Sequence, residues 1–270
     1  MLMNHLPGEF EDSSDRSSAT QARPILLTGA AGRIGTAFRL AHGQDYRFRL
    51  ADLESSAITD TPGEAHETIR LDVADAAACH AACAGIDIVV HLAADPRPDA
   101  PWDSLLQNNI QGVVNICEAA LAAGCQRVVF ASSAHAIGAY PPELTLADDA
   151  PPRPGNLYGA SKVFGEGVLS AFATRGLSGI AIRIGAYEAP WYYEDTDDNV
   201  AAAYVSPRDM NQLLVRAIET PGITYAVVAG ISNNRQQRFD LRHTRALLGY
   251  APQDDGFRAR EEHAPRTGEA

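Results

Sequence analysis

Short apolar runs alternate with amphipathic, helix-like stretches along most of the chain. The first run, Pro24–Thr28, ends in a turn rich in glycine, and a helical pattern follows it to about Ala41. Further strands are predicted at 47–51, 68–71, 86–92, 127–131, 179–184 and 224–229, and further helices at 74–84, within 102–123, from about 157, at 207–220 and at 239–248. Strands separated by helices in this way form a parallel sheet that is covered on both faces. Right-handed crossovers then predict an α/β fold with a doubly wound parallel sheet.

The alternation lapses between Gly185 and Val205, where tyrosine, tryptophan and acidic residues are frequent. Ser206 and Pro207 then supply an N-cap and a first-turn proline for the next helix. We therefore expect one domain over 23–257, with a small substrate lobe formed mainly by 186–257. The polar stretch 1–22 is expected to be a disordered tail, and 258–270 a loose C-terminal tail.

Composition narrows the class of protein. The formal net charge is −12, and binding to phosphates needs a basic face, so nucleic acid is not expected as a partner. No apolar run approaches the ~18–20 residues that span a bilayer, and the first residues lack the apolar core of a secretory signal. These observations predict a cytoplasmic protein without a membrane partner. The four cysteines lack the spacing of a zinc site, so no metal is expected.

One lysine stands among 22 basic residues, and it is Lys162. All other basic positions hold arginine, which indicates that position 162 needs an ammonium group rather than a guanidinium. The alternative is that a lysine stands here by chance. Lys162 lies four residues after Tyr158 at the start of a predicted helix, so the two side chains share a face. A cation there favours the phenolate and is expected to lower the pKa of the tyrosine toward the working range. The pattern predicts Tyr158 as a catalytic base.

Three glycines in the first strand–helix turn, Gly29, Gly32 and Gly35, have the spacing of a dinucleotide-binding loop. Such glycines make a tight turn and let the backbone approach a pyrophosphate. The helix that follows then directs its unpaired N–H groups and the positive end of its dipole at the phosphates. The alternative is a tight turn without a ligand.

Asp52 ends the second predicted strand, where an acid can bind the adenosine ribose hydroxyls and repel a 2′-phosphate. This favours NAD as the cofactor, while Arg33 and Arg49 keep NADP as an alternative. Asp72 and Val73 follow the third strand and are expected to border the adenine.

Hydroxyl and imidazole side chains follow the strand at 127–131. Because ligands bind at the carboxyl ends of parallel strands, Ser133 and His135 are expected to lie at the cleft. Ser133 can hold the reacting oxygen by a hydrogen bond and so assist Tyr158. His135 either contacts substrate or is a structural histidine, and Ser132 is interpreted as a loop hydroxyl only.

These motifs resemble those of the extended short-chain dehydrogenases, and more narrowly those of the bacterial uronate dehydrogenases. The shared stretches include Leu-Thr-Gly-Ala-Ala-Gly (27–32), Leu-Ala-Asp-Leu (50–53), Val-Phe-Ala-Ser-Ser (129–133) and Leu-Tyr-Gly (157–159). The resemblance runs from about Pro24 to Tyr250 and implies a Rossmann-type fold with NAD as the cofactor.

The resemblance also implies roles for individual residues. It makes Ser133, Tyr158 and Lys162 catalytic. Contacts with NAD are implied for Gly29, Gly32, Arg33, Ile34, Gly35, Asp52, Leu53, Asp72, Val73, Leu92, Ala93, Ala94, Tyr158, Lys162 and Ile184. Contacts with the sugar are implied for Asn109, Ser133 and His135.

Departures from the uronate dehydrogenases fall where the substrate is chosen. Ala134 and Ala186 stand where that family has an asparagine and a serine. The family holds the uronate carboxylate with an arginine of the following loop, yet no arginine lies between Arg183 and Arg208. The acids of this loop disfavour a carboxylate. Arg97 or Arg208 is expected to anchor any anionic substrate instead.

The aromatic residues of the same loop allow two interpretations. Trp191, Tyr192 and Tyr193 either form an aromatic surface beneath a sugar ring, or they serve packing while the loop is a solvated lid.

The sequence thus predicts an NAD-dependent enzyme that oxidises an aldose or a uronic acid to a lactone. One alternative is a nucleotide-sugar epimerase or dehydratase with tightly bound NAD, which the short C-terminal lobe disfavours. A second alternative is a non-catalytic NAD(H)-sensing protein, which has no need of the Ser/Tyr/Lys set. Fold alone does not separate the three. The resemblance also suggests a homo-oligomer that pairs through the helices in 102–123 and 157–175.

Overall fold

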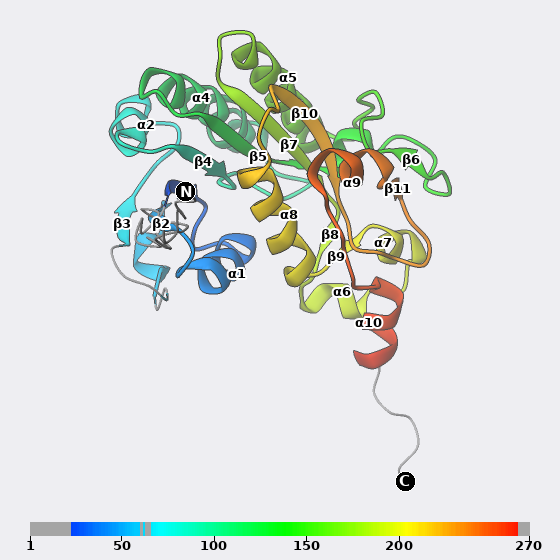
Figure 1. Ribbon diagram of the computed structural model, residues 1–270. Helices are drawn as coiled ribbons and strands as arrows, with labels where there is room; N and C mark the ends of the chain where they lie inside the picture. Colours follow the sequence, from blue (N-terminus) through cyan, green and yellow to red (C-terminus); the bar gives the residue numbers. More distant parts are fainter. Residues whose placement is uncertain (1–22, 60–61, 63–65, 264–270) are drawn as a thin grey trace, which may run out of the picture.

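A seven-stranded parallel sheet forms the centre of the molecule in the computed structural model, which describes residues 23–59, 62 and 66–263 (Figure 1). The expected tail 1–22 lies outside the described residues. The strand order is β10-β7-β5-β4-β1-β2-β3. The strands are β1 (Pro24–Thr28), β2 (Arg47–Asp52), β3 (Glu67–Arg70), β4 (Ile88–His91), β5 (Arg127–Ser133), β7 (Ser178–Ile184) and β10 (Tyr225–Gly230). This order confirms the doubly wound α/β fold.

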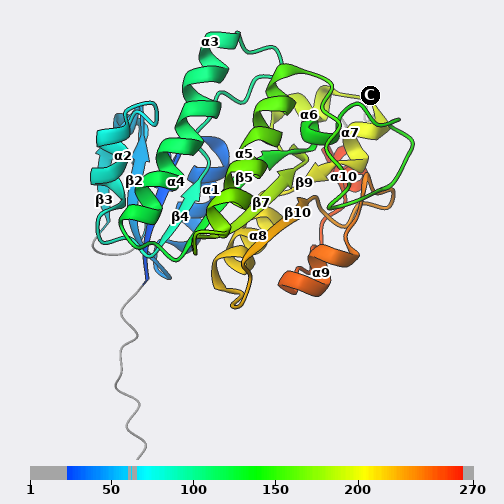
Figure 2. The same cartoon turned by 90° about the horizontal axis from the view of Figure 1, so that it is seen from above.

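Helices cover both faces of the sheet (Figure 2). Those on one face are α2 (Ala76–Cys83), α4 (Gly112–Ala122) and α5 (Leu157–Ala173). Those on the other are α1 (Arg33–His42), α8 (Pro207–Glu219) and α9 (Arg242–Leu248). Every residue of β4 and β5 is buried, because strands packed on both faces need continuous rather than alternating apolar runs. Among the described helices, none is long and apolar enough to cross a membrane.

The long helix expected within 102–123 is irregular in its first half. It begins as α3 (Trp102–Ser104), continues as a π-helical segment, η2 (Leu105–Gln111), and becomes regular in α4. π-Helical turns recur at functional sites because they shift side chains out of the α-helical register. Asn109 lies on this segment.

The C-terminal lobe consists of short elements at the carboxyl edge of the sheet. Two small parallel pairs join β8 (Ala186–Tyr187) to β9 (Tyr204–Val205) and β6 (Leu146–Ala147) to β11 (Phe239–Asp240). The helices α6 (Pro190–Glu194) and α7 (Asp198–Ala202) fill the stretch where the sequence pattern lapsed. The helix predicted over 239–248 is too long at its start: Phe239 and Asp240 pair with β6, and the Asp240 carboxylate then accepts the N–H of Arg242.

The last described helix, α10 (Gly256–His263), occupies the first residues of the segment expected to be loose. Its Arg260 lies over the Tyr192 ring and donates to the carbonyls of Tyr192, at 3.3 Å, and Asp197, at 2.9 Å. These bonds attach α10 to the acidic loop, so this part of the expected C-terminal tail is ordered structure.

Candidate active site

The glycine turn between β1 and α1 leaves room for a ligand's backbone. Gly29 has φ +71°, and a Cβ there would lie 2.8 Å from the nitrogen of Ala93. A Cβ on Gly35 would lie 2.3 Å from the Gly29 carbonyl oxygen, so α1 packs directly on the turn. Gly32 precedes Arg33 at the start of α1 and has no side chain to cap the first N–H groups. Such N–H groups bind anions, and the turn therefore fits the pyrophosphate of a dinucleotide.

Asp52 is fixed beside this turn. One of its carboxylate oxygens accepts the N–H of Ala31 at 2.9 Å, and the other accepts the N–H of Glu54 at 3.1 Å. Leu53 next to it is 46% exposed. The geometry places a carboxylate at the end of β2, where the ribose of a bound dinucleotide is expected.

The other residues that the sequence assigned to the adenosine end of the cofactor are Arg49, Asp72 and Val73. Arg49 bonds Glu67 at 2.7 Å and two backbone carbonyls at the end of α2, so of the two arginines that favoured NADP only Arg33 lies at the turn. Asp72 accepts a backbone N–H in the turn after β3. Val73 is buried, and its side chain packs against Gly112 at the start of α4.

The carboxyl ends of four strands lie along one edge of the sheet. The Thr28 hydroxyl at the end of β1 accepts the N–H of Ala93, and Leu92 donates to the Thr28 carbonyl. Leu92, Ala93 and Ala94 are half-buried. Ser133 at the end of β5 pairs in register with Ile184 at the end of β7. The structure therefore gathers at this edge the strand-end residues that the sequence assigned to the cofactor and to catalysis.

Ser133, Tyr158 and Lys162 come together at this edge. Tyr158 and Lys162 lie one turn apart on α5, and the Lys162 Nζ is 5.6 Å from the centroid of the Tyr158 ring and 5.1 Å from that of Phe130. The Tyr158 hydroxyl is hydrogen-bonded to the Ser133 side chain. All three side chains are at least nine-tenths buried. This arrangement suits the transfer of one proton from a bound hydroxyl.

The pKa of Tyr158 differs from the sequence-based expectation. Burial raises it, the hydrogen bond with Ser133 lowers it, and the Asp95 carboxylate raises it. Burial also lowers the pKa of Lys162 to about 8. The expected lowering of the tyrosine pKa by the lysine is not seen, because desolvation acts on both groups and opposes the charged form of each.

A buried ion pair that the sequence did not reveal lies next to the candidate catalytic residues on β5 and α5. Arg183 of β7 bonds both oxygens of Glu166 on α5, at 2.8 and 2.9 Å, and the Ser132 hydroxyl donates to Glu166 at 2.6 Å. Ser132 is thus more than a loop hydroxyl, since it helps to tie β5, α5 and β7 together. The one clue in the sequence was that Glu166 lies four residues after Lys162, which places both side chains on the same face of the helix.

Asn109 is held by hydrogen bonds within the protein. It is 4% exposed, its oxygen accepts the Asp95 N–H at 2.8 Å, and its nitrogen donates to the Asp95 carbonyl at 3.1 Å and to Ser161 at 3.0 Å. Both amide hydrogens are therefore used within the protein. Asn109 thereby holds the loop after β4 against α5, and a sugar contact would use the second lone pair of its amide oxygen.

Arg97 lies on the loop that Asn109 holds. Its Nε and Nη2 donate to the two oxygens of Asp95, at 3.0 and 2.7 Å, while its side chain remains 61% exposed. The ion pair and a hydrogen bond from Ser104 hold the pKa of Asp95 far below its usual range. The Asp95 carboxylate raises the pKa of Tyr158, so this loop lies near the Tyr158 side chain. The exposed side of the guanidinium can still bind an anion.

His135 and Asn156 lie next to Tyr158. The His135 backbone N–H donates to the Ser133 hydroxyl at 3.1 Å, and the imidazole meets the Tyr158 ring edge-on with centroids 5.5 Å apart. Asn156 caps α5 and places its Nδ2 3.2 Å from the His135 Nδ1. Asn156 was not predicted as a functional residue, although its place immediately before Leu157 is that of an N-cap.

In the loop that holds Trp191, Tyr192 and Tyr193, the aromatic side chains mainly pack against the protein and do not form an exposed surface for a sugar ring. Tyr192 is fully buried, with Tyr204 and Arg260 against its ring. Tyr193 stacks on His263 of α10 at 3.9 Å. Of the three aromatic residues in question, Trp191 is the most exposed, at 42%. The packing interpretation therefore accounts for Tyr192 and Tyr193.

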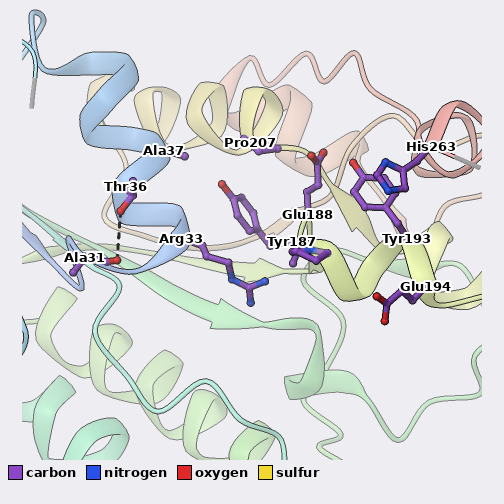
Figure 3. Close-up of a pocket in the computed structure, with 12 residues that line it drawn as sticks. Ala31, Arg33, Thr36, Ala37, Tyr187, Glu188, Tyr193, Glu194, Pro207 and His263 are labelled. Atoms are coloured by element: carbon purple, nitrogen blue, oxygen red, sulfur yellow. Dashed lines mark hydrogen bonds between the residues drawn. The ribbon is translucent and has the colours of Figure 1, made fainter. Parts of the chain in front are cut away.

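A cavity of about 710 Å³ joins the glycine turn to this lobe (Figure 3). Arg33 and Thr36 of α1 line one side, and Tyr187 and Glu188 line the other. Ser133, Tyr158 and Lys162 are not among its lining residues. Arg208, the other candidate anchor, forms an ion pair with Asp254 and is not among the residues that line the cavity. The cavity thus extends the phosphate end of the site rather than the catalytic end.

Comparison with known proteins agrees with this geometry. The model of the NAD dependent epimerase/dehydratase family matches residues 25–237. The chain is 38% identical to an NAD-dependent glucose-6-phosphate dehydrogenase of Haloferax volcanii, over 86% of this chain and 94% of that protein. It is 40% identical to an L-arabinose 1-dehydrogenase (NAD(P)(+)) of the same organism, over 86% and 96%.

A solved structure of a uronate dehydrogenase mutant from Agrobacterium tumefaciens, complexed with NAD, superposes with a TM-score of 0.78 at 34% identity. The match covers 91% of each chain. The three proteins share one fold and differ in the sugar that their names give.

Proposed function

The chain belongs to the NAD dependent epimerase/dehydratase family, and we propose that Ser133, Tyr158 and Lys162 catalyse its reaction, the NAD-dependent oxidation of a sugar hydroxyl to a lactone. Relatives that are 34–40% identical over most of the chain oxidise sugars with NAD. The observation that supports the catalytic assignment is the meeting of these three side chains at the sheet edge that carries the glycine turn.

Each residue has a distinct part in the proposed reaction. The Ser133 hydroxyl bonds the reacting hydroxyl of the sugar and keeps it beside Tyr158. The phenolate oxygen of Tyr158 removes the proton of that hydroxyl, and Lys162 stabilises the phenolate by its charge. Bound NAD supplies the acceptor for the hydride that leaves the same carbon. Loss of the proton and the hydride from the anomeric centre leaves the carbonyl of a lactone.

The residues around the glycine turn fit the dinucleotide. The N–H groups of the first turn of α1 face its pyrophosphate, and the Asp52 carboxylate binds the adenosine ribose. Arg33, Ile34 and Leu53 flank these groups, and Ile184 lies opposite Ser133. A 2′-phosphate would meet the charge of Asp52, which supports a preference for NAD.

A panel of substrates tests the proposal. Neutral aldoses, uronic acids, sugar phosphates and nucleotide sugars are each mixed with NAD⁺, and the formation of NADH is followed by its absorbance. We expect NADH from a free or phosphorylated sugar, and loss of that signal in Tyr158→Phe. Interconversion of nucleotide sugars without release of NADH would instead support an epimerase.

A further inference from the structure

Asn156 makes two hydrogen bonds that together define which way its amide faces. Its Oδ1 accepts the N–H of Gly159 at 2.7 Å, which caps the first turn of α5. Its Nδ2 lies 3.2 Å from the Nδ1 of His135. Because an amide oxygen only accepts and a backbone N–H only donates, the cap leaves the NH₂ group facing the imidazole.

This orientation determines the protonation of His135. The Asn156 NH₂ is a donor, so the His135 Nδ1 has to present a lone pair to it. Burial lowers the pKa of His135, so the neutral ring is favoured. A neutral imidazole with a lone pair on Nδ1 carries its one proton on Nε2. Within the described part of the chain, the Nε2 has no hydrogen-bond partner.

The backbone fixes this imidazole next to the catalytic hydroxyls. The His135 N–H bonds the Ser133 Oγ, and the His135 ring meets the Tyr158 ring edge-on. A Cβ on Gly159 would lie 2.2 Å from the His135 carbonyl oxygen, so the start of α5 touches the His135 backbone. His135 remains partly exposed in spite of these contacts.

We propose that Asn156 is a positioning residue that holds His135 in the Nε2–H tautomer, so that His135 donates a hydrogen bond to an acceptor oxygen of the sugar. This inference rests on the proposed function. It also describes the substrate class, because a neutral donor requires an oxygen lone pair near the reacting carbon but no negative charge. Neutral and anionic sugars both offer such an oxygen, and deoxy sugars that lack it are expected to bind about tenfold more weakly.

Two substitutions separate this role from the capping of α5. Asn156→Asp and Asn156→Ser both keep an N-cap acceptor for Gly159, so the thermal stability of the protein is expected to change little. The carboxylate of Asn156→Asp accepts from Nδ1 and moves the imidazole proton there. The shorter serine does not reach the imidazole and leaves the tautomer free. Asn156→Ala, which removes the cap as well, is the control for a purely structural effect.

The direct measurement is the ¹⁵N NMR spectrum of the His135 ring in the full chain. We expect the Nε2–H tautomer in the unmodified protein and a protonated Nδ1 in Asn156→Asp. The KM for the sugar is expected to rise about tenfold in Asn156→Asp with a smaller change in kcat, since one neutral hydrogen bond is lost. In a His135→Gln background, whose amide has no tautomer, Asn156→Asp should have no further effect on KM.

Opposite results would overturn the proposal. An Nδ1–H tautomer in the unmodified protein would contradict the assignment whatever the activity. If Asn156→Asp lowered only the melting temperature and left the KM unchanged, Asn156 would act as a helix cap and have no part in positioning His135. The NMR measurement needs no substrate, so a protein that shows Nε2–H but oxidises no sugar would contradict the proposed function and leave the tautomer assignment intact.

Discussion

The Nζ of Lys162 lies 5.6 Å from the centre of the Tyr158 ring, one turn further along α5. We expect Tyr158→Phe to lower kcat by ~10²–10⁴-fold, the usual contribution of a positioned acid–base group, while NAD still binds. Lys162→Arg should also be severely impaired, because a guanidinium is larger than an ammonium. Steady-state kinetics together with titration of NAD⁺ binding check this. Near-normal turnover in Tyr158→Phe would contradict the mechanism.

The rate is expected to depend on pH with a definite sign. Because burial raises the pKa of Tyr158, the phenolate that removes the proton becomes more populated as the pH rises. We expect kcat/KM to increase with pH from neutrality, by up to ~tenfold per pH unit, until Lys162, with a pKa of about 8, loses its charge. A pH–rate profile measures this. A profile that is flat across the neutral and alkaline range would show that another group is the base.

Cofactor choice is expected to depend on Asp52. Its carboxylate would repel the 2′-phosphate of NADP⁺, so kcat/KM should be clearly higher with NAD⁺. Asp52→Ser and Asp52→Ala should narrow that difference. Arg49→Ala is the matched control, since Arg49 is held by Glu67 and should leave the ratio unchanged. A preference of the unmodified protein for NADP⁺ would point to Arg33 instead.

The choice of sugar is expected to depend on Arg97. A charge-assisted hydrogen bond contributes ~1.5–3 kcal/mol, or about tenfold to a hundredfold in affinity. With Ala186 after β7 and no arginine in the acidic loop, galacturonate and glucuronate are expected to have high KM values. A neutral aldose, or a sugar phosphate bound by Arg97, should have a lower KM.

Two variants test the anchor. Arg97→Ala should raise the KM for an anionic sugar and change that for a neutral aldose little. Arg208→Ala, which removes the same charge from a pair with Asp254, should change neither. The unmodified protein could instead be saturated by a uronic acid at low concentration, and Arg97→Ala could leave that KM unchanged. These two results together would show that another residue binds the carboxylate.

Lys162 is expected to lower the stability of the folded protein at neutral pH. Burial lowers its pKa from 10.5 to about 8, so the charged form is less favourable in the folded than in the unfolded state. Lys162→Met should therefore raise the free energy of unfolding at pH 7 by on the order of 2–3 kcal/mol. This gain should disappear as the pH rises above the unfolded pKa, because both states then hold a neutral lysine.

Urea unfolding without NAD, measured across this pH range, checks the expectation for Lys162→Met. Lys162→Arg keeps the charge and should show no gain at any pH. Equal stability of Lys162→Met and the unmodified protein at pH 7 would show that the ammonium is better solvated than its burial suggests.

Local pattern was sufficient for the fold. β4 and β5 are buried along their whole length and have apolar centres, and such runs between helices permit few arrangements other than a parallel sheet. The proximity of Ser133, Tyr158 and Lys162 was also predictable, since Tyr158 and Lys162 are close in sequence and Ser133 ends a strand. The prediction was poorer where contacts between distant segments decide the structure. Phe239 pairs with β6, which no pattern around residue 239 shows.

Hydrogen-bond partners could not be predicted in the same way. Asn109 donates its amide hydrogens to Asp95 and Ser161, which come from two other segments, and the local sequence shows no sign of these bonds. The pKa of Tyr158 was misjudged because the burial of a side chain is a property of the folded molecule. Arg260 was assigned to a loose tail because its partners, Tyr192 and Asp197, lie more than sixty positions earlier in the chain.

The burial of the single lysine has a practical consequence for handling the protein. Lys162 is 3% exposed and is the one lysine of the sequence. Active esters and aldehydes, which couple to primary amines, therefore meet no exposed lysine on the molecular surface. Amine-reactive reagents are therefore expected to leave Lys162 unmodified as long as the protein stays folded.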